Sequence, residues 1–160
     1  MRLSDGVEWS LHCLWLLGVL GEDRALPAGR FAEFYGLPPG YLSKILKTLV
    51  NAGLLTSSTG PRGGFRLARA PEAITVLDVV RAVEGPQPMF QCTEIRQRGP
   101  EPLSPRACRT PCGIAGVMHR AEAAWQAELR ATTIADVVTH TRGDSTARAH
   151  RWARWLEVAG

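Results

Sequence analysis

The order of elements predicted for residues 28–69 constrains the fold more than any other feature of the sequence. A short helix over 28–35 ends at Gly36, a turn rich in proline follows, and a second helix is expected over 40–52. Two short strands then flank a glycine-rich turn. Helix, turn, helix and hairpin in this order predict a winged helix-turn-helix with a two-stranded β wing, and therefore a mainly α fold.

Further helices are expected on both sides of this unit. Asp5 and Glu8 have the spacing of a capping box for a helix over 5–21, and Thr75 is the expected cap of a helix over 76–84. A proline-rich stretch without periodic pattern follows. We expect four segments: a winged-helix domain over 1–85, an irregular loop over 86–112, a long amphipathic helix over 113–140 and a tail over 141–160.

Basic residues gather on the predicted second helix and wing. The net charge of +4 is modest, but residues 44–69 contain five basic residues and no acid. Lysines there can neutralise phosphates, and a serine can reach base edges. A solvated basic surface is the alternative, but the order of the elements favours double-stranded DNA as the partner. The residues expected at this surface are Ser43, Lys44 and Lys47 on the helix, and Arg62 and Arg66 on the wing.

Several other classes of protein are disfavoured. No apolar run approaches the ~18–20 residues of a membrane span, and the start of the chain lacks the basic segment of a signal peptide. We therefore expect a cytoplasmic protein with no membrane partner. No zinc-hydrolase motif or nucleophile elbow is present, so we do not expect an enzyme. The glycine-rich turn leads into a strand and not a helix, which excludes a nucleotide-binding loop.

Distinctive motifs relate the chain to a known family. They are Met1-Arg2-Leu3, Tyr41-Leu42, Ile45-Leu46, Gly53-Leu54-Leu55, Gly60-Pro61-Arg62-Gly63-Gly64-Phe65, Ile74-Thr75-Val76 and Ala82-Val83-Glu84. With them, roughly residues 1–140 resemble the IscR/NsrR-type iron–sulfur transcription regulators. The resemblance implies a homodimer with crossed C-terminal helices, which makes 113–140 a dimerisation helix. It also implies operator binding, expected to repress, with Tyr41, Ser43, Pro61 and Arg62 at the DNA.

Two of the four cysteines, Cys108 and Cys112, are separated by three residues just before the C-terminal helix. That spacing lets two thiolates bind one iron, and Arg106 and Arg109 nearby would favour the thiolate form. Cys92 lies across the proline-rich loop, whereas the family has three cysteines at short, near-even spacing. Cys92 is therefore either a third ligand or a bystander. Cys13, among leucines, is most simply a buried small hydrophobe.

The remaining cluster ligands must come from elsewhere, because four protein ligands normally hold a cluster. Glu8 and His12 are four residues apart on the first helix, so they project from one face. The resemblance places an acidic ligand from the partner's first helix at Glu8, and His12 follows one turn later. We expect a [2Fe–2S] cluster, in preference to [4Fe–4S], with Cys108 and Cys112 on one iron and these two residues of the partner subunit on the other. Its redox state or integrity would control operator affinity.

Simpler roles are open for these residues. Glu8 is also the predicted capping-box partner of Asp5, and a single histidine on an apolar helix is more often a hydrogen-bonded core residue. Cys92 and His119 are the reserve ligands. Two thiolates with a histidine also suit zinc, and the two neighbouring cysteines also suit a disulfide switch.

Overall fold

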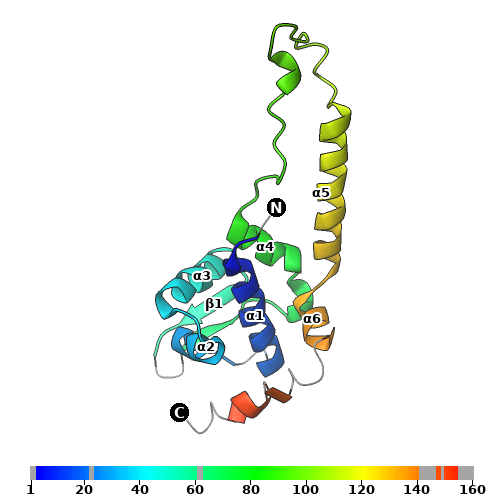
Figure 1. Cartoon of the computed structure of the whole chain (residues 1–160). Coiled ribbons are helices and arrows are strands. Elements are labelled where there is room, and N and C mark those ends of the chain that lie inside the picture. Colours follow the sequence, from blue (N-terminus) through cyan, green and yellow to red (C-terminus); the bar gives the residue numbers. More distant parts are fainter. Residues whose placement is uncertain (1–2, 22–23, 61–62, 141–146, 149, 155–160) are drawn as a thin grey trace. The chain divides into compact units, whose positions relative to one another are not determined.

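The computed structural model describes residues 3–21, 24–60, 63–140, 147–148 and 150–154. The chain forms two compact units, each described by itself: Arg2–Pro86 with Leu129–Gly160, and Gln87–Glu128. Figure 1 labels the elements. In the first unit they are α1 (Asp5–Leu20), α2 (Ala28–Tyr35), α3 (Pro39–Asn51), β1 (Leu55–Ser58), β2 (Gly64–Leu67), the 3₁₀ turn η1 (Pro71–Ala73), α4 (Val76–Glu84) and α6 (Ile134–His140).

The predicted order of helix, turn, helix and hairpin is confirmed, and so is the mainly α fold class. Thr75 caps α4 in the predicted way, because its hydroxyl accepts from the Asp78 N–H while the Asp78 carboxylate accepts from the Thr75 N–H. Among the helices of the described residues, none is long and apolar enough to cross a bilayer.

The predicted capping box at the start of α1 is wrong. Ser4, not Asp5, is the N-cap residue, and no side chain caps this end. The Ser4 N–H and hydroxyl instead donate to Oε1 of Glu84, at 2.8 and 2.6 Å. These two hydrogen bonds lower the pKa of Glu84 and tie the start of α1 to the end of α4. Glu8 therefore has no capping role.

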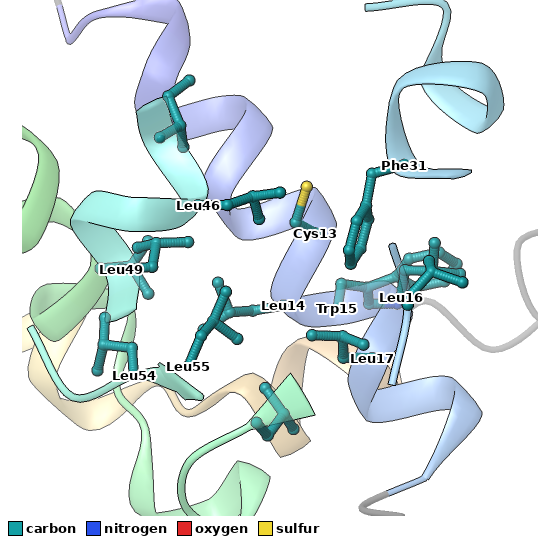
Figure 2. Packing of buried hydrophobic residues seen from close by; sticks show 14 of the residues in the cluster. Cys13, Leu14, Trp15, Leu16, Leu17, Phe31, Leu46, Leu49, Leu54 and Leu55 are labelled. Carbon is teal, nitrogen blue, oxygen red and sulfur yellow. The ribbon is translucent and has the colours of Figure 1, made fainter. Parts of the chain in front are cut away.

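The core of the first unit lies between α1 and α3. The predicted apolar stripe of α3 is confirmed: Leu42, Ile45, Leu46 and Leu49 are all buried. Figure 2 shows the Cys13 side chain of α1 between Leu46 and Phe31 of α2. This packing holds one face of α3 inside the molecule and leaves the opposite face to solvent.

The wing is an antiparallel hairpin with a third short neighbour that the sequence pattern did not predict. β1 and β2 pair from Leu55 opposite Leu67 to Ser58 opposite Gly64. Phe65 of β2 also exchanges two backbone hydrogen bonds of 2.9 Å with Leu26. A Cβ atom at Gly64 would lie 2.5 Å from the Leu26 carbonyl carbon, and the φ of Gly64 is +148°. Glycine is required here for the internal packing of the wing.

Replacing Gly64 with alanine is expected to lower the free energy of unfolding by about 2 kcal/mol, because the new methyl group meets backbone and the φ is strained. The loss would appear as a lower Tm in thermal unfolding followed by circular dichroism. Gly29→Ala is the matched control, since nothing lies within 4 Å of a Cβ there. An equal Tm for Gly64→Ala and the wild type would contradict this account of the wing.

The predicted single helix over 113–140 is wrong, because the structure has α5 (Gly113–Ala131) and then α6. Thr133 begins a second capping box: its N–H and hydroxyl donate to the Asp136 carboxylate at 2.8 and 2.6 Å, and the Asp136 N–H donates to the hydroxyl. These bonds lower the pKa of Asp136. The backbone on either side also pairs with Ile74 and Val76. The backbone therefore leaves the helical conformation after α5 to form this strand-like contact, and α6 begins after it.

The second unit consists of an irregular loop and most of α5. The loop was predicted to be irregular, and it contains one 3₁₀ turn, η2 (Ile95–Gln97). Cys92, Cys108 and Cys112 lie in residues 87–112 of this unit, which we call the cysteine loop.

Candidate DNA interface and metal centre

The solvent face of α3 carries the residues predicted to read DNA. Tyr41, Lys44 and Lys47 are exposed, and Tyr41 exposes 48% of its surface despite its aromatic ring. Ser43 is half-buried, and its hydroxyl donates to the carbonyl oxygen of Pro39 at 2.8 Å. The oxygen lone pairs of Ser43 remain for a donor on a base or phosphate.

The wing carries one further cation that was predicted to contact DNA and lies among the described residues. Arg66 lies exposed on β2, where it pairs with Thr56 of β1. Pro61 and Arg62, which were also predicted to contact DNA, lie outside the described residues. We call the described set, Tyr41, Ser43, Lys44, Lys47 and Arg66, the reading face.

The reading face is in contact with α1. The ring of Trp9 packs edge-on against Tyr41, with ring centroids 5.3 Å apart and planes at 88°. Next to this contact is a hollow of about 200 Å³. Its lining is Ser4, Tyr41, Lys44, Ile45, Thr48 and Val83. A displacement of the first two turns of α1 would therefore act directly on the start of α3.

Glu8 and His12 both lie exposed on α1. No described residue forms a hydrogen bond or ion pair with the Glu8 carboxylate. The His12 ring packs against Tyr35, with centroids 5.4 Å apart, while the Tyr35 hydroxyl donates to the backbone oxygen of His12 at 2.8 Å. His12 is not the core histidine considered as an alternative, because its side chain is exposed. Its ring opens onto a cavity of about 220 Å³ lined also by Leu11, Trp15, Phe34, Tyr35, Val137 and Arg148.

Cys13 follows His12 but belongs to the core. It is fully buried, and this burial raises the pKa of its thiol to about 12. The thiol therefore stays protonated at neutral pH. The prediction that Cys13 is a small hydrophobic residue is confirmed.

Cys108 and Cys112 are half-buried free thiols in the cysteine loop. The Cys112 sulfur accepts a hydrogen bond of 3.5 Å from the backbone N–H of Ala115, in the first turn of α5. Between the two cysteines, the carbonyl oxygen of Thr110 accepts a hydrogen bond of 3.1 Å from Nη2 of Arg96. A helix N-terminus and a guanidinium are both sources of positive potential, which suits a pair of thiolates that hold a metal.

The reserve ligands have less support. Cys92 is exposed, and the exposed His119 packs edge-on against Phe90 with centroids 6.1 Å apart. Within the described part of the chain, no three His, Cys, Asp or Glu side chains come together as a metal site. Cys108 and Cys112 belong to one unit, and Glu8 and His12 belong to the other.

Comparison with known proteins assigns the chain to a family. The family model for Rrf2, described as an iron-dependent transcriptional regulator, matches residues 3–140. The chain belongs to the Rrf2 family. The chain is 34% identical over 142 residues to the HTH-type transcriptional regulator YffB of Lactococcus lactis, covering 89% of this chain and 90% of YffB. It is 30% identical to the regulator NsrR of Shouchella clausii, covering 86% and 89% of the two chains.

Similarity to a solved regulator structure confirms the winged-helix fold. CymR of Bacillus subtilis, described as a global cysteine regulator, superposes with a TM-score of 0.69 at 25% identity, covering 88% of this chain and 98% of CymR. The relatives are named as transcriptional regulators and not as enzymes. The predictions of a transcription regulator, of the IscR/NsrR type of family and of a non-enzymatic role are therefore confirmed.

The sequence pattern did not identify Arg96 as a residue that bonds the segment between Cys108 and Cys112. The notable arginines were expected to be Arg106 and Arg109, which lie closer to the cysteines in sequence. Both side chains are exposed, and in the described part of the chain neither forms a hydrogen bond or ion pair. Nothing in the sequence distinguishes Arg96 from Arg98 beside it, because its role depends on the path of the loop.

Proposed function

We propose that this Rrf2 regulator is a homodimer that binds double-stranded operator DNA as a repressor, with its affinity set by an interface iron–sulfur cluster. The cluster is [2Fe–2S] in preference to [4Fe–4S], and its redox state or integrity is the controlling variable. The observation that carries this proposal is the pair of free thiols, Cys108 and Cys112, held at the N-terminus of α5 beside Arg96. Because the ligand of the protein is DNA, the expected compartment is the cytoplasm.

Two donor pairs would hold the cluster. Cys108 and Cys112 supply sulfur, and Glu8 and His12 of the partner subunit supply the other two donors. The proposal is supported by the state of Glu8, an exposed carboxylate without a described partner, and by the exposed ring of His12 on the same face of α1. A carboxylate and an imidazole opposite two thiolates resemble the division of ligands in a Rieske centre.

An exposed apolar stripe on α5 supports the dimer. Ile114, Val117 and Met118 expose 73%, 54% and 41% of their surfaces, and their spacing places them on one face. Apolar side chains of this size on one helix face are typical of a helix that packs against another. We propose the same face of a second copy as its partner.

The reading face would enter the major groove, with Lys44, Lys47 and Arg66 at phosphates and Tyr41 and Ser43 near base edges. Pro61 and Arg62 complete the proposed DNA contacts from their position in the family motif. In a dimer the two half-sites lie about one helical turn, ~34 Å, apart. A small change in the position of either α3 would therefore reduce the fit to both half-sites.

Coupling between the two sites would run through α1. When bound, the cluster supplies reversible one-electron chemistry and sensitivity to oxidants. Glu8 and His12 lie on either side of Trp9 in α1, and Trp9 contacts Tyr41 on the reading face. A change in how the two donors are held would therefore move the turn of α1 that carries Trp9, and with it the Trp9–Tyr41 contact at the reading face.

A second candidate keeps the regulator but replaces the cluster. Cys108 and Cys112 are both free, and one relative of known structure is a cysteine regulator, so zinc binding or a dithiol–disulfide switch is the alternative. Anaerobic purification of the full-length protein separates the two candidates. We expect a coloured protein with equal amounts of iron and acid-labile sulfide. A colourless protein with zinc, or with no metal and two titratable thiols that oxidise to a disulfide, would reject the cluster.

A further inference from the structure

The cysteine loop contains a cluster of hydrogen-bonded polar groups that does not include the thiols. Arg96 donates from Nε to Oε1 of Glu94 at 2.6 Å and from Nη2 to Oε2 at 2.9 Å. The same Nη2 donates to the carbonyl oxygen of Thr110 at 3.1 Å. One guanidinium thus connects the η2 turn to the middle of the Cys108–Cys112 segment. We call Glu94, Arg96 and Thr110 the clamp.

The backbone around the clamp is fixed as well. The carbonyl oxygen of Arg96 accepts a hydrogen bond of 2.8 Å from the N–H of Leu103. Glu94 has a φ of 50°, the one positive value among the described non-glycine residues. This backbone conformation costs free energy for any residue other than glycine, so the surrounding contacts must stabilise it. The clamp and its neighbouring backbone bond therefore define the path of the loop at this point.

The charge of Arg96 acts on both cysteines. Its side chain is only 24% exposed. The pKa of Arg96 is raised, first by its hydrogen bonds to Glu94, then by charge interaction with Glu94 and with Cys108 and Cys112. Arginine suits this place better than lysine, because its planar fork can bond a carboxylate with two N–H groups and still reach a carbonyl.

We propose that Arg96 is the positioning residue of the cysteine centre, since its guanidinium holds the Cys108–Cys112 segment through Thr110 and keeps a positive charge beside whatever anionic group the two thiols carry. The identity of that group, an iron–sulfur cluster, rests on the proposed function. The role of Arg96 at the thiols does not, so the two can fail separately.

Alkylation of the thiols tests the charge without any cluster. Iodoacetate and iodoacetamide both form a sulfur–carbon bond and release iodide, but only iodoacetate is an anion. The ratio of their rates at a cysteine therefore reports local potential and cancels the reactivity of the thiol itself. It would be measured for Cys92, Cys108 and Cys112 by peptide mass spectrometry, on the full-length chain after iron is removed by chelation.

In Arg96→Gln we expect the iodoacetate-to-iodoacetamide ratio to fall about threefold at Cys108 and Cys112 at low salt, with a smaller fall at high salt. Cys92 in the same sample should be unaffected. Arg98→Gln is the matched control, because it removes the same charge two residues away from a side chain that makes no described hydrogen bond. An unchanged ratio in Arg96→Gln, or an equal fall in Arg98→Gln, would overturn the proposal.

The holding role needs a second pair of variants. Arg96→Lys keeps the charge but loses the fork, and Glu94→Gln weakens the partner of the fork. Both should retain most of the alkylation ratio in chelated protein while lowering the iron content of anaerobically purified protein. If the wild type binds a cluster, any cluster that remains in Arg96→Gln should have a lower midpoint potential than in the wild type. The reason is that the variant lacks a cation that favours the reduced state. Full iron content in Arg96→Lys, together with an unshifted potential in Arg96→Gln, would refute the positioning role. If the wild type binds none, the cluster proposal fails and the alkylation ratio still decides on Arg96.

Discussion

Replacing Cys108 with serine is expected to reduce the iron and sulfide content of the purified protein to the level of an empty preparation. The hydroxyl of serine is a poor ligand for iron at neutral pH, and in the proposed site one iron would keep a single sulfur ligand. Cys92→Ser is the matched control. Cys92 is exposed, and it belongs to no group of three or more His, Cys, Asp or Glu side chains among the described residues. That variant should therefore keep its visible absorption.

His12→Ala extends the same prediction to the other unit. In the proposed site the two thiols need two further ligands, and the candidates Glu8 and His12 belong to the other unit. If the imidazole of His12 is a ligand, its loss should abolish or change the visible spectrum while the circular dichroism spectrum stays native. An unaltered cluster spectrum in His12→Ala would remove this residue from the ligand set.

A mixed dimer tests whether the ligands come from both subunits. One protomer carries Cys108→Ser and the other His12→Ala, with different affinity tags so that only the heterodimer is collected. If each site takes sulfur from one chain and His12 from the other, one of the two sites joins intact residues, and we expect about half the wild-type iron. If each chain supplies all of its own ligands, both sites are damaged and no iron binds. The second outcome would reject a shared centre.

Local sequence patterns predicted most of the fold because the forces involved are local. The spacing of Leu42, Ile45, Leu46 and Leu49 defines the buried side of α3, and Thr75 with Asp78 defines the start of α4. The break before α6 was missed, although Thr133 and Asp136 repeat the same capping pattern. A continuous apolar stripe outweighed that pattern in the prediction, whereas in the structure the backbone pairing with the segment before α4 favours the break.

The candidate sites were predictable to different degrees. One helix period was enough to predict that Lys44 and Lys47 lie on the solvent side of α3, and both are exposed; Tyr41, which the family resemblance supplied, is exposed beside them. Glu8 was predicted to take part in a local helix cap, but Ser4 bonds Glu84 instead. This contact was not predictable from a local pattern because it spans 80 positions. Arg96 could not be found at all, since its partner Thr110 is brought to it by an irregular loop. Contacts that cross a loop leave no periodic trace in the sequence.

Reversing the charge of Lys44 is expected to weaken operator binding on the order of 100-fold, because a dimer carries two copies and each lost phosphate contact with added repulsion costs roughly tenfold. Lys44 is exposed on the reading face, so Lys44→Glu should leave the Tm unchanged. Measured over a salt series, the neutral variant Lys44→Ala should flatten the dependence of log affinity on log salt by about one unit per protomer. Arg98→Glu makes the same change of net charge in the cysteine loop and controls for the overall field of the protein. A similar loss of affinity in both charge reversals, or an unaltered salt slope in Lys44→Ala, would place Lys44 away from the phosphates.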